Sequence, residues 1–270
     1  MAVKKQYIHF SFDDVWECLH DITLNVGRYQ SVFENPFFAW MKEMHDKYGA
    51  VFSLYTFNYF SKEPSYDISN LPNCYAEELS GNSHWLKFGF HAKDDPKKYA
   101  EDEAEGIKAD YEKFLAAISQ ATNGHEESID KIVRLGWFAG TRQNVLALRD
   151  TEHGIKGLLS ADDDRLPYYF NEKETDEVKR KGEMLLDALL ILRSQTRIES
   201  IWSKEELLDK IRGYTEAKVI ELFSHECCFE RISRVEGCTM PQLYEYVIKW
   251  AYEKRYGFGF AQEIYEDLGD

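Results

Sequence analysis

The hydrophobic pattern of the chain alternates between two kinds of segment. Short, largely apolar runs are typical of buried strands, and longer segments with apolar residues every three or four positions are typical of amphipathic helices. The predicted strands are Tyr7–Phe12, Ala50–Phe57, Trp85–Phe90, Ile132–Trp137, Ile155–Ser160 and Lys218–Phe223. The predicted helices are Phe33–Tyr48, Pro96–Ala121, Gln143–His153, Lys204–Arg212 and Pro241–Lys254.

Two segments are less clear. Met184–Arg193 suits a helix or a buried strand, because periodicity does not separate the two over so short a run. Arg197–Ile201 is expected to be a strand. Ser203 and Glu206 have the spacing of a capping box at the start of the helix that follows.

This alternation predicts a parallel sheet whose strands are joined by helical crossovers. Six or seven such units favour a closed or nearly closed (β/α) barrel over a doubly wound open sheet. No glycine-rich phosphate loop follows the first strand, which argues further against the open sheet. No Gly-, Ser- or Pro-rich linker interrupts the pattern, so a single domain over residues 1–270 is expected.

Charge narrows the class of partner. The formal net charge is −15, and the sequence has no basic cluster. Nucleic acids and anionic membrane surfaces attract an excess of Lys and Arg, so neither is an expected partner. Aromatic residues make up 15% of the chain, enough to fill a core, line a cleft or leave room for a homo-oligomeric interface.

Cysteine usage and hydropathy indicate a compartment. The five cysteines form no CxxC pair, which fits reduced thiols better than a disulfide framework or a structural zinc site. The sequence contains neither a signal-peptide core nor a run of about 18 apolar residues. A soluble, cytoplasmic protein is the expectation.

Acidic and imidazole side chains follow several predicted strands. Asp13 and Asp14 end the first strand, His91 follows the third, Asp162–Asp164 follow the fifth, and His225 follows the last. In (β/α) barrels the carboxyl ends of the strands form the functional face, so these side chains are expected to converge on one rim.

Each of these residues also has a structural explanation. Asp13 or Asp14 would serve as the N-cap of a helix that begins near Val15, and Asp94 as the cap of the helix entered at Pro96. His91 alone would be an ordinary buried histidine bonded to the backbone. The functional interpretation therefore depends on convergence.

Three motifs resemble a known family. "FSFDD" at the first strand, "GFHA" after the third and "VIELFSHE" near the C-terminus, in this order between residues 7 and 226, resemble the polysaccharide deacetylase superfamily, which includes chitooligosaccharide deacetylases. The resemblance implies a distorted (β/α) barrel, with seven strands as its usual number.

The resemblance also implies a set of roles. Asp13 would be the general base, and Asp14 and His91 would be metal ligands. Asp95 stands where the family has a second ligating histidine, four residues after His91, and completes a chemically reasonable triad. His225 would be the general acid.

Other residues match less closely. Arg134 loosely echoes the family's arginine and would orient Asp13. Trp137 would stack on a sugar ring, and Asp163 is a second candidate for contact with substrate. Val15 replaces the usual glycine after the paired acids.

Two functional hypotheses follow from the resemblance. The first is a metal-dependent hydrolase that removes an acyl group from an N-acetylated carbohydrate or related small amide, with zinc as the expected ion and cobalt, manganese or nickel as alternatives. The second is a barrel of the same ancestry that binds a carbohydrate, or a partner, without hydrolysing it. A third hypothesis, independent of the resemblance, is a glycosidase that uses Glu199 and Glu221 as its two carboxylates.

Overall fold

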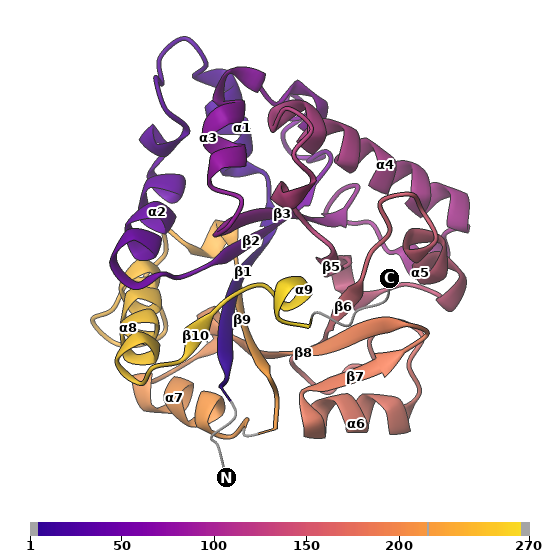
Figure 1. Cartoon of the computed structure of the whole chain (residues 1–270), viewed down its shortest axis with the longest axis vertical. Coiled ribbons are helices and arrows are strands. Elements are labelled where there is room, and N and C mark those ends of the chain that lie inside the picture. Colours follow the sequence, from indigo (N-terminus) through magenta and orange to yellow (C-terminus); the bar gives the residue numbers. More distant parts are fainter. Residues whose placement is uncertain (1–4, 215, 266–270) are drawn as a thin grey trace.

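Parallel strands form the centre of the molecule. The computed structural model describes residues 5–214 and 216–265. Hydrogen-bonded strands run in the order β4-β3-β2-β1-β9-β8-β6-β5, and every pair along this path is parallel (Figure 1). The bounds are β1 Tyr7–Val15, β2 Phe52–Phe57, β3 Leu86–Ala92, β4 Ile129–Asp130, β5 Ile132–Val133, β6 Gly157–Ser160, β8 Leu189–Arg197 and β9 Val219–His225.

The two ends of this path are adjacent in the chain. Only Lys131 separates β4 from β5, so the pair acts as one interrupted strand that bonds to β3 on one side and β6 on the other. Counted this way, the eight strands of the path become a ring of seven in the described part of the chain. The expected (β/α) barrel is confirmed.

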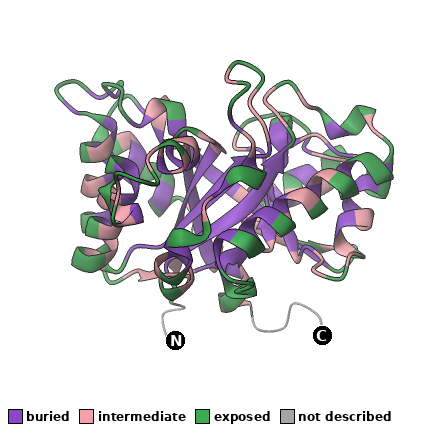
Figure 2. Ribbon diagram, turned by 90° about the horizontal axis from the view of Figure 1, so that it is seen from above, coloured by how far each residue is buried: buried purple, intermediate pink, exposed green. Residues whose placement is uncertain are grey.

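Helices surround the ring on its outer side. They are α1 Glu17–Leu24, α2 Pro36–Tyr48, α3 Ala76–Gly81, α4 Ala104–Ala121, α5 Arg142–Arg149, α6 Glu172–Lys181, α7 Lys204–Arg212 and α8 Met240–Glu253. The short α9, Ala261–Ile264, lies instead over the amino-terminal ends of the strands, where Lys218 Nζ donates to the carbonyl oxygen of Ile264 at 2.6 Å (Figure 1). Figure 2 shows the strands buried at the centre and the exposed residues on the outer faces of the helices. No helix among the described residues is both long and apolar enough to cross a membrane.

Alternation along β1 separates an apolar layer from a polar interior. Phe12 packs edge-on against Phe37 of α2 and stacks on Tyr244 of α8, so this side of the strand faces the helices. The intervening residues His9, Ser11 and Asp13 are also buried but bond to polar groups of other strands. Side chains that alternate along a strand point to opposite faces, so β1 turns polar residues toward the barrel interior.

The ambiguous segment proves to be a hairpin. Glu183–Leu186 forms β7, which pairs antiparallel with β8, and Asp187 and Ala188 turn between them with positive φ. The expected strand at Arg197–Ile201 is instead the end of β8 followed by a short 3-10 turn. A further strand, β10 Gly257–Phe258, adds to the start of β1.

Local capping differs partly from expectation. Ser203 caps α7 by accepting a hydrogen bond from Glu206 N, as the spacing predicts. The Glu206 carboxylate, however, accepts from Trp202 N at 2.9 Å and not from Ser203 N, so the reciprocal half of the capping box is displaced by one residue.

Candidate functional site

A backbone irregularity at the end of β1 separates the paired carboxylates. The register with β2 shifts between Phe12 and Val15, and Asp14 takes a φ of 55°. This left-handed conformation is uncommon for a residue other than Gly, Asn or Asp. Its effect is that Asp13 stays inside the barrel, 3% exposed, whereas Asp14 reaches the open end with its side chain 31% exposed.

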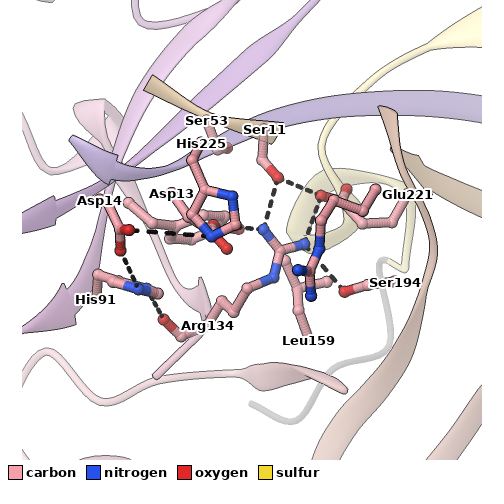
Figure 3. A network of polar contacts seen from close by, with 12 residues as sticks. Ser11, Asp13, Asp14, Ser53, His91, Arg134, Leu159, Ser194, Glu221 and His225 are labelled. Atoms are coloured by element: carbon pink, nitrogen blue, oxygen red, sulfur yellow. Dashed lines mark hydrogen bonds and ion pairs between the residues drawn. The ribbon is translucent and has the colours of Figure 1, made fainter. Parts of the chain in front are cut away.

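Asp14 lies between two imidazoles from neighbouring parts of the rim. Its Oδ1 is 3.1 Å from Nε2 of His91 at the end of β3, and its Oδ2 is 3.9 Å from Nε2 of His225 at the end of β9 (Figure 3). Burial alone would raise the pKa of Asp14, but the hydrogen bond and charge of His91, with His225, lower it below the ordinary value. The convergence of these three side chains, expected from the strand ends, is present.

The orientation of His91 leaves one nitrogen facing Asp14. His91 Nδ1 lies 2.5 Å from the backbone carbonyl oxygen of Arg134, which only accepts hydrogen bonds. Nδ1 therefore carries the proton, and Nε2 faces the Asp14 carboxylate. His91 Nε2 and Asp14 Oδ1 are then both acceptors, so a proton or a cation must lie between them. A metal-ligating histidine usually donates its other ring N–H to a carbonyl or carboxylate, as His91 Nδ1 does to the Arg134 carbonyl.

Arg134 links Asp13 to the barrel interior. The guanidinium is 1% exposed; Nη1 donates to Asp13 Oδ1 at 2.5 Å, and Nη2 donates to Glu221 Oε1 at 3.0 Å (Figure 3). Ser11 and Ser194 hydroxyls accept further hydrogen bonds, each at 3.0 Å. Burial would lower the pKa of Arg134, but Asp13 and Glu221 raise it above its ordinary value, so the cation is retained.

Glu221 belongs to this buried network and not to the cavity. It is fully buried, and its carboxylate bonds to His9 and Ser11 as well as Arg134. The glycosidase hypothesis requires two carboxylates that flank a substrate. Because Glu221 is inaccessible, the pair of Glu199 and Glu221 does not provide that arrangement.

His225 is held by a second carboxylate. Its Nδ1 lies 2.6 Å from Glu199 Oε1, in the turn that follows β8. Desolvation would lower the pKa of His225, but the hydrogen bond to Glu199 and the charges of Asp13, Glu199 and Asp14 raise it to about 9. At neutral pH, His225 is therefore a cation whose Nε2 proton faces the cavity.

Replacing Glu199 with Gln is expected to bring the pKa of His225 down from about 9 to the ordinary range near 6.5 or below, because desolvation then acts without the anionic partner. The measurement is an NMR titration of the His225 ring in metal-free protein. Glu205→Gln, on the exposed start of α7, is the control and should leave the titration unchanged. A His225 titration that is the same in both variants would contradict the assigned pair.

Glu226, next to His225, has a structural role that the sequence pattern did not reveal. Its carboxylate accepts hydrogen bonds from the backbone N–H groups of Trp16, Glu17 and Cys18, each at 2.8 Å. It thus caps the N-terminus of α1 from a distant strand end. Neither Asp13 nor Asp14 caps this helix, so both remain available to the site.

A cavity of about 360 Å³ at the carboxyl ends of the strands is lined by Asp13, Asp14, His91, Arg134 and His225, among others. Trp137, 55% exposed and with a φ of 63°, lies at its edge, and its indole Nε1 donates to the backbone carbonyl of Asp95 at 3.0 Å. Asp163 also lines the cavity, but both of its carboxylate oxygens accept from Arg165 Nε at 2.9 Å. Trp137 is thus accessible to a ligand, whereas Asp163 is engaged by its neighbour.

Asp95 lies at the same cavity but not beside the other expected ligands. Its carboxylate is 3.3 Å from Lys62 Nζ at the surface, with the side chain 39% exposed. Within residues 5–214 and 216–265, no group of three or more His, Cys, Asp and Glu side chains is placed to hold a metal ion. Asp14 and His91 fit two ligand positions, and the third position expected at Asp95 is not assembled.

Comparison with known proteins extends these observations. No family model matches the sequence, and no curated protein matches it. Among solved structures, a putative polysaccharide deacetylase from Mycobacterium smegmatis superposes with a TM-score of 0.55 at 10% identity, covering 98% of this chain and 90% of the other. A family 4 acetyl xylan esterase from Clostridium thermocellum, in complex with a cobalt ion, gives a TM-score of 0.52 at 10% identity, covering 97% and 91%.

The fold is therefore that of the carbohydrate esterases and deacetylases built on a distorted (β/α) barrel. The resemblance to polysaccharide deacetylases found in the three sequence motifs is confirmed at the level of the fold, over nearly the whole chain and at 10% sequence identity.

Proposed function

We propose that this protein is a metal-dependent hydrolase of the deacetylase kind, which removes an acyl group from an acylated carbohydrate or related small amide. One observation carries the proposal: Asp13, Asp14, His91 and His225, from three separate strands, meet at one cavity at the carboxyl end of the barrel. The similar structures add support, because their names describe enzymes that release acyl groups from polysaccharides.

Asp14 Oδ1 and His91 Nε2 would hold a divalent cation, with water or substrate in the remaining positions. When bound, such an ion lowers the pKa of a water molecule and polarises a carbonyl oxygen. A site with two protein ligands suits an ion that keeps several of its water molecules. Catalytic zinc, in contrast, usually has three protein ligands. Zinc, cobalt, manganese and nickel therefore remain to be compared by experiment.

Asp13 and His225 would move the protons. Arg134 donates to Asp13 Oδ1 and orients the carboxylate, so that Oδ2 would accept a proton from the nucleophilic water. His225, a cation at neutral pH, would donate its Nε2 proton to the departing amine or alcohol. Groups on two sides of one cavity can thus serve as general base and general acid. Trp137 offers a ring face on which a sugar can stack.

A second function, carbohydrate binding without hydrolysis, is favoured by one specific observation. The carboxylate of Asp95 turns to Lys62 instead of toward Asp14 and His91, so the ligand set is shorter than the motif implies. A site of this kind would retain the cavity and Trp137 but would not activate water.

Metal retention separates the two functions. Protein loaded with zinc, cobalt or manganese in separate experiments and then dialysed is expected to keep about one ion, and Asp14→Ala is expected to lose it. Asp164→Ala, which removes a fully exposed carboxylate from a nearby loop, is the matched control. Acetate release from acetylated oligosaccharides is then measured with the retained ion.

The outcomes are distinct. Metal retention with acetate release supports the hydrolase. Equally little metal in the wild type and in Asp14→Ala, together with binding of oligosaccharide, supports the non-catalytic function. Asp95→Ala decides the size of the ligand set: retention equal to the wild type supports two ligands, and loss comparable to Asp14→Ala restores the three-ligand expectation.

A further inference from the structure

The cavity carries a second cluster of charge, beside His225 and apart from Asp14 and His91. Arg197, the last residue of β8, and Arg165, in the loop between β6 and α6, both line it. Neither side chain takes part in the chemistry described above.

Each of the two guanidinium groups is bonded to one aspartate and keeps N–H donors that this aspartate does not use. The only hydrogen bond of the Arg197 side chain to a described residue runs from Nη2 to Asp162 Oδ1, at 3.2 Å. Toward the described part of the chain, the Arg165 side chain donates through Nε alone, to both carboxylate oxygens of Asp163. A guanidinium has five N–H donors, so each arginine is oriented by a neighbouring aspartate while most of its donors remain free.

The carboxylates next to Arg197 and Arg165 already have partners. Asp162 and Asp163 each already engage an arginine, and Glu199, 3.9 Å from Arg197 Nε, is bonded to His225. Each arginine is thus paired with one aspartate, and the feature available to an anion is the set of N–H donors that these aspartates do not use.

We propose that Arg197, assisted by Arg165, forms an anion-binding subsite, and that the protein selects a carbohydrate carrying a carboxylate or phosphate group over its neutral counterpart. A planar guanidinium with free N–H groups binds such anions through two parallel hydrogen bonds. The inference rests on the proposed function for the location of the reacting acyl group, but the preference for an anion is a property of binding alone.

The test compares two probes that differ in one group: N-acetylglucosamine and the corresponding uronic acid, with a carboxylate at carbon 6. Dissociation constants are measured by calorimetry or NMR at neutral pH. The acid is expected to bind the wild type about tenfold or more tightly than the neutral sugar, as one charge-assisted guanidinium–carboxylate contact would give. Arg197→Gln is expected to remove most of that preference and to change binding of the neutral sugar less than twofold.

Controls distinguish this role from a structural one. Arg197→Lys keeps the charge but not the planar pair of donors, and it should restore the preference only in part. If Arg197 only supports the loop, Arg197→Gln weakens both probes equally and lowers the melting temperature, which would overturn the proposal. Equal binding of the two probes to the wild type, or no binding of the acid at millimolar concentration, would also overturn it.

The result is independent of turnover. If the protein prefers the acid through Arg197 but releases no acetate, the anion-binding subsite is supported and the proposed hydrolase function is contradicted. A protein that releases acetate equally from neutral and acidic substrates, with equal binding, would retain the hydrolase function and lose the subsite.

Discussion

Replacement of Asp13 with Asn is expected to lower acyl hydrolysis by about 10²–10⁴-fold, the range associated with loss of a positioned general base. The amide keeps an oxygen that accepts from Arg134 Nη1, so the side chain remains in place while its capacity to take a proton from water is lost. The measurement is kcat for acetate release at saturating metal.

Metal retention and ligand binding serve as the controls for this variant. Asp13 bonds to Arg134 and is not one of the proposed ligands of the ion, so Asp13→Asn should keep both the ion and the carbohydrate. Asp14→Ala should lose the ion, so the two neighbouring carboxylates are expected to fail in different ways. An Asp13→Asn protein with wild-type kcat would show that Asp13 is not the base, whatever its position.

Much of the site was predictable because a barrel places the carboxyl ends of its strands on one rim. Asp14, His91 and His225 each lie at the last or next-to-last position of a strand, and the structure brings them together across more than two hundred residues of sequence. The alternation of His9, Ser11 and Asp13 with apolar residues also follows from the period of a strand. Strand-end position was therefore an informative signal, stronger than any single motif.

Side chains beyond a strand end were less predictable, because loop paths are not set by periodicity. Asp95 lies four residues after His91, the spacing of a ligand in the family, but the loop takes its carboxylate to Lys62. Glu199 was considered only as a glycosidase acid, yet a 3-10 turn places it behind His225. Spacing identifies residues of suitable chemistry, and only the path of the loop decides which groups meet.

Hydrogen bonds between polar side chains and groups far away in the sequence were also not predictable from sequence patterns. Glu226 was expected to belong to a functional motif, whereas it caps α1 through three backbone N–H groups. Arg134 only loosely matched a motif, but its contacts with Asp13 and Glu221 make it the centre of the buried network. Such contacts join strands that are far apart in sequence and depend on the closure of the barrel.

Replacement of Arg134 with Met is expected to destabilise the protein by about 3–5 kcal/mol, the usual cost of removing one partner of a buried ion pair. Asp13 would lose its one ion-pair partner among the described residues while remaining buried, whereas Glu221 would retain His9. The free energy of unfolding in urea at neutral pH measures the effect. Arg142→Met is the matched control: Arg142 pairs with Asp187 at the surface, 63% exposed, and because exposed ion pairs contribute little, its loss should lower the free energy of unfolding far less than Arg134→Met does.

The pH dependence of this loss identifies its cause. Burial would raise the pKa of Glu221, but His9 and, to a smaller extent, Arg134 hold it below its ordinary value. A lowered carboxyl pKa adds stability that is present above about pH 4.5 and is lost as the pH falls. Arg134→Met loses the part of this contribution that comes from Arg134, so its stability depends less on pH in this range. The difference between wild type and variant should therefore narrow as the pH falls from 7 toward 4. A difference that stays constant over this range would assign the loss to packing of the arginine side chain and not to its charge.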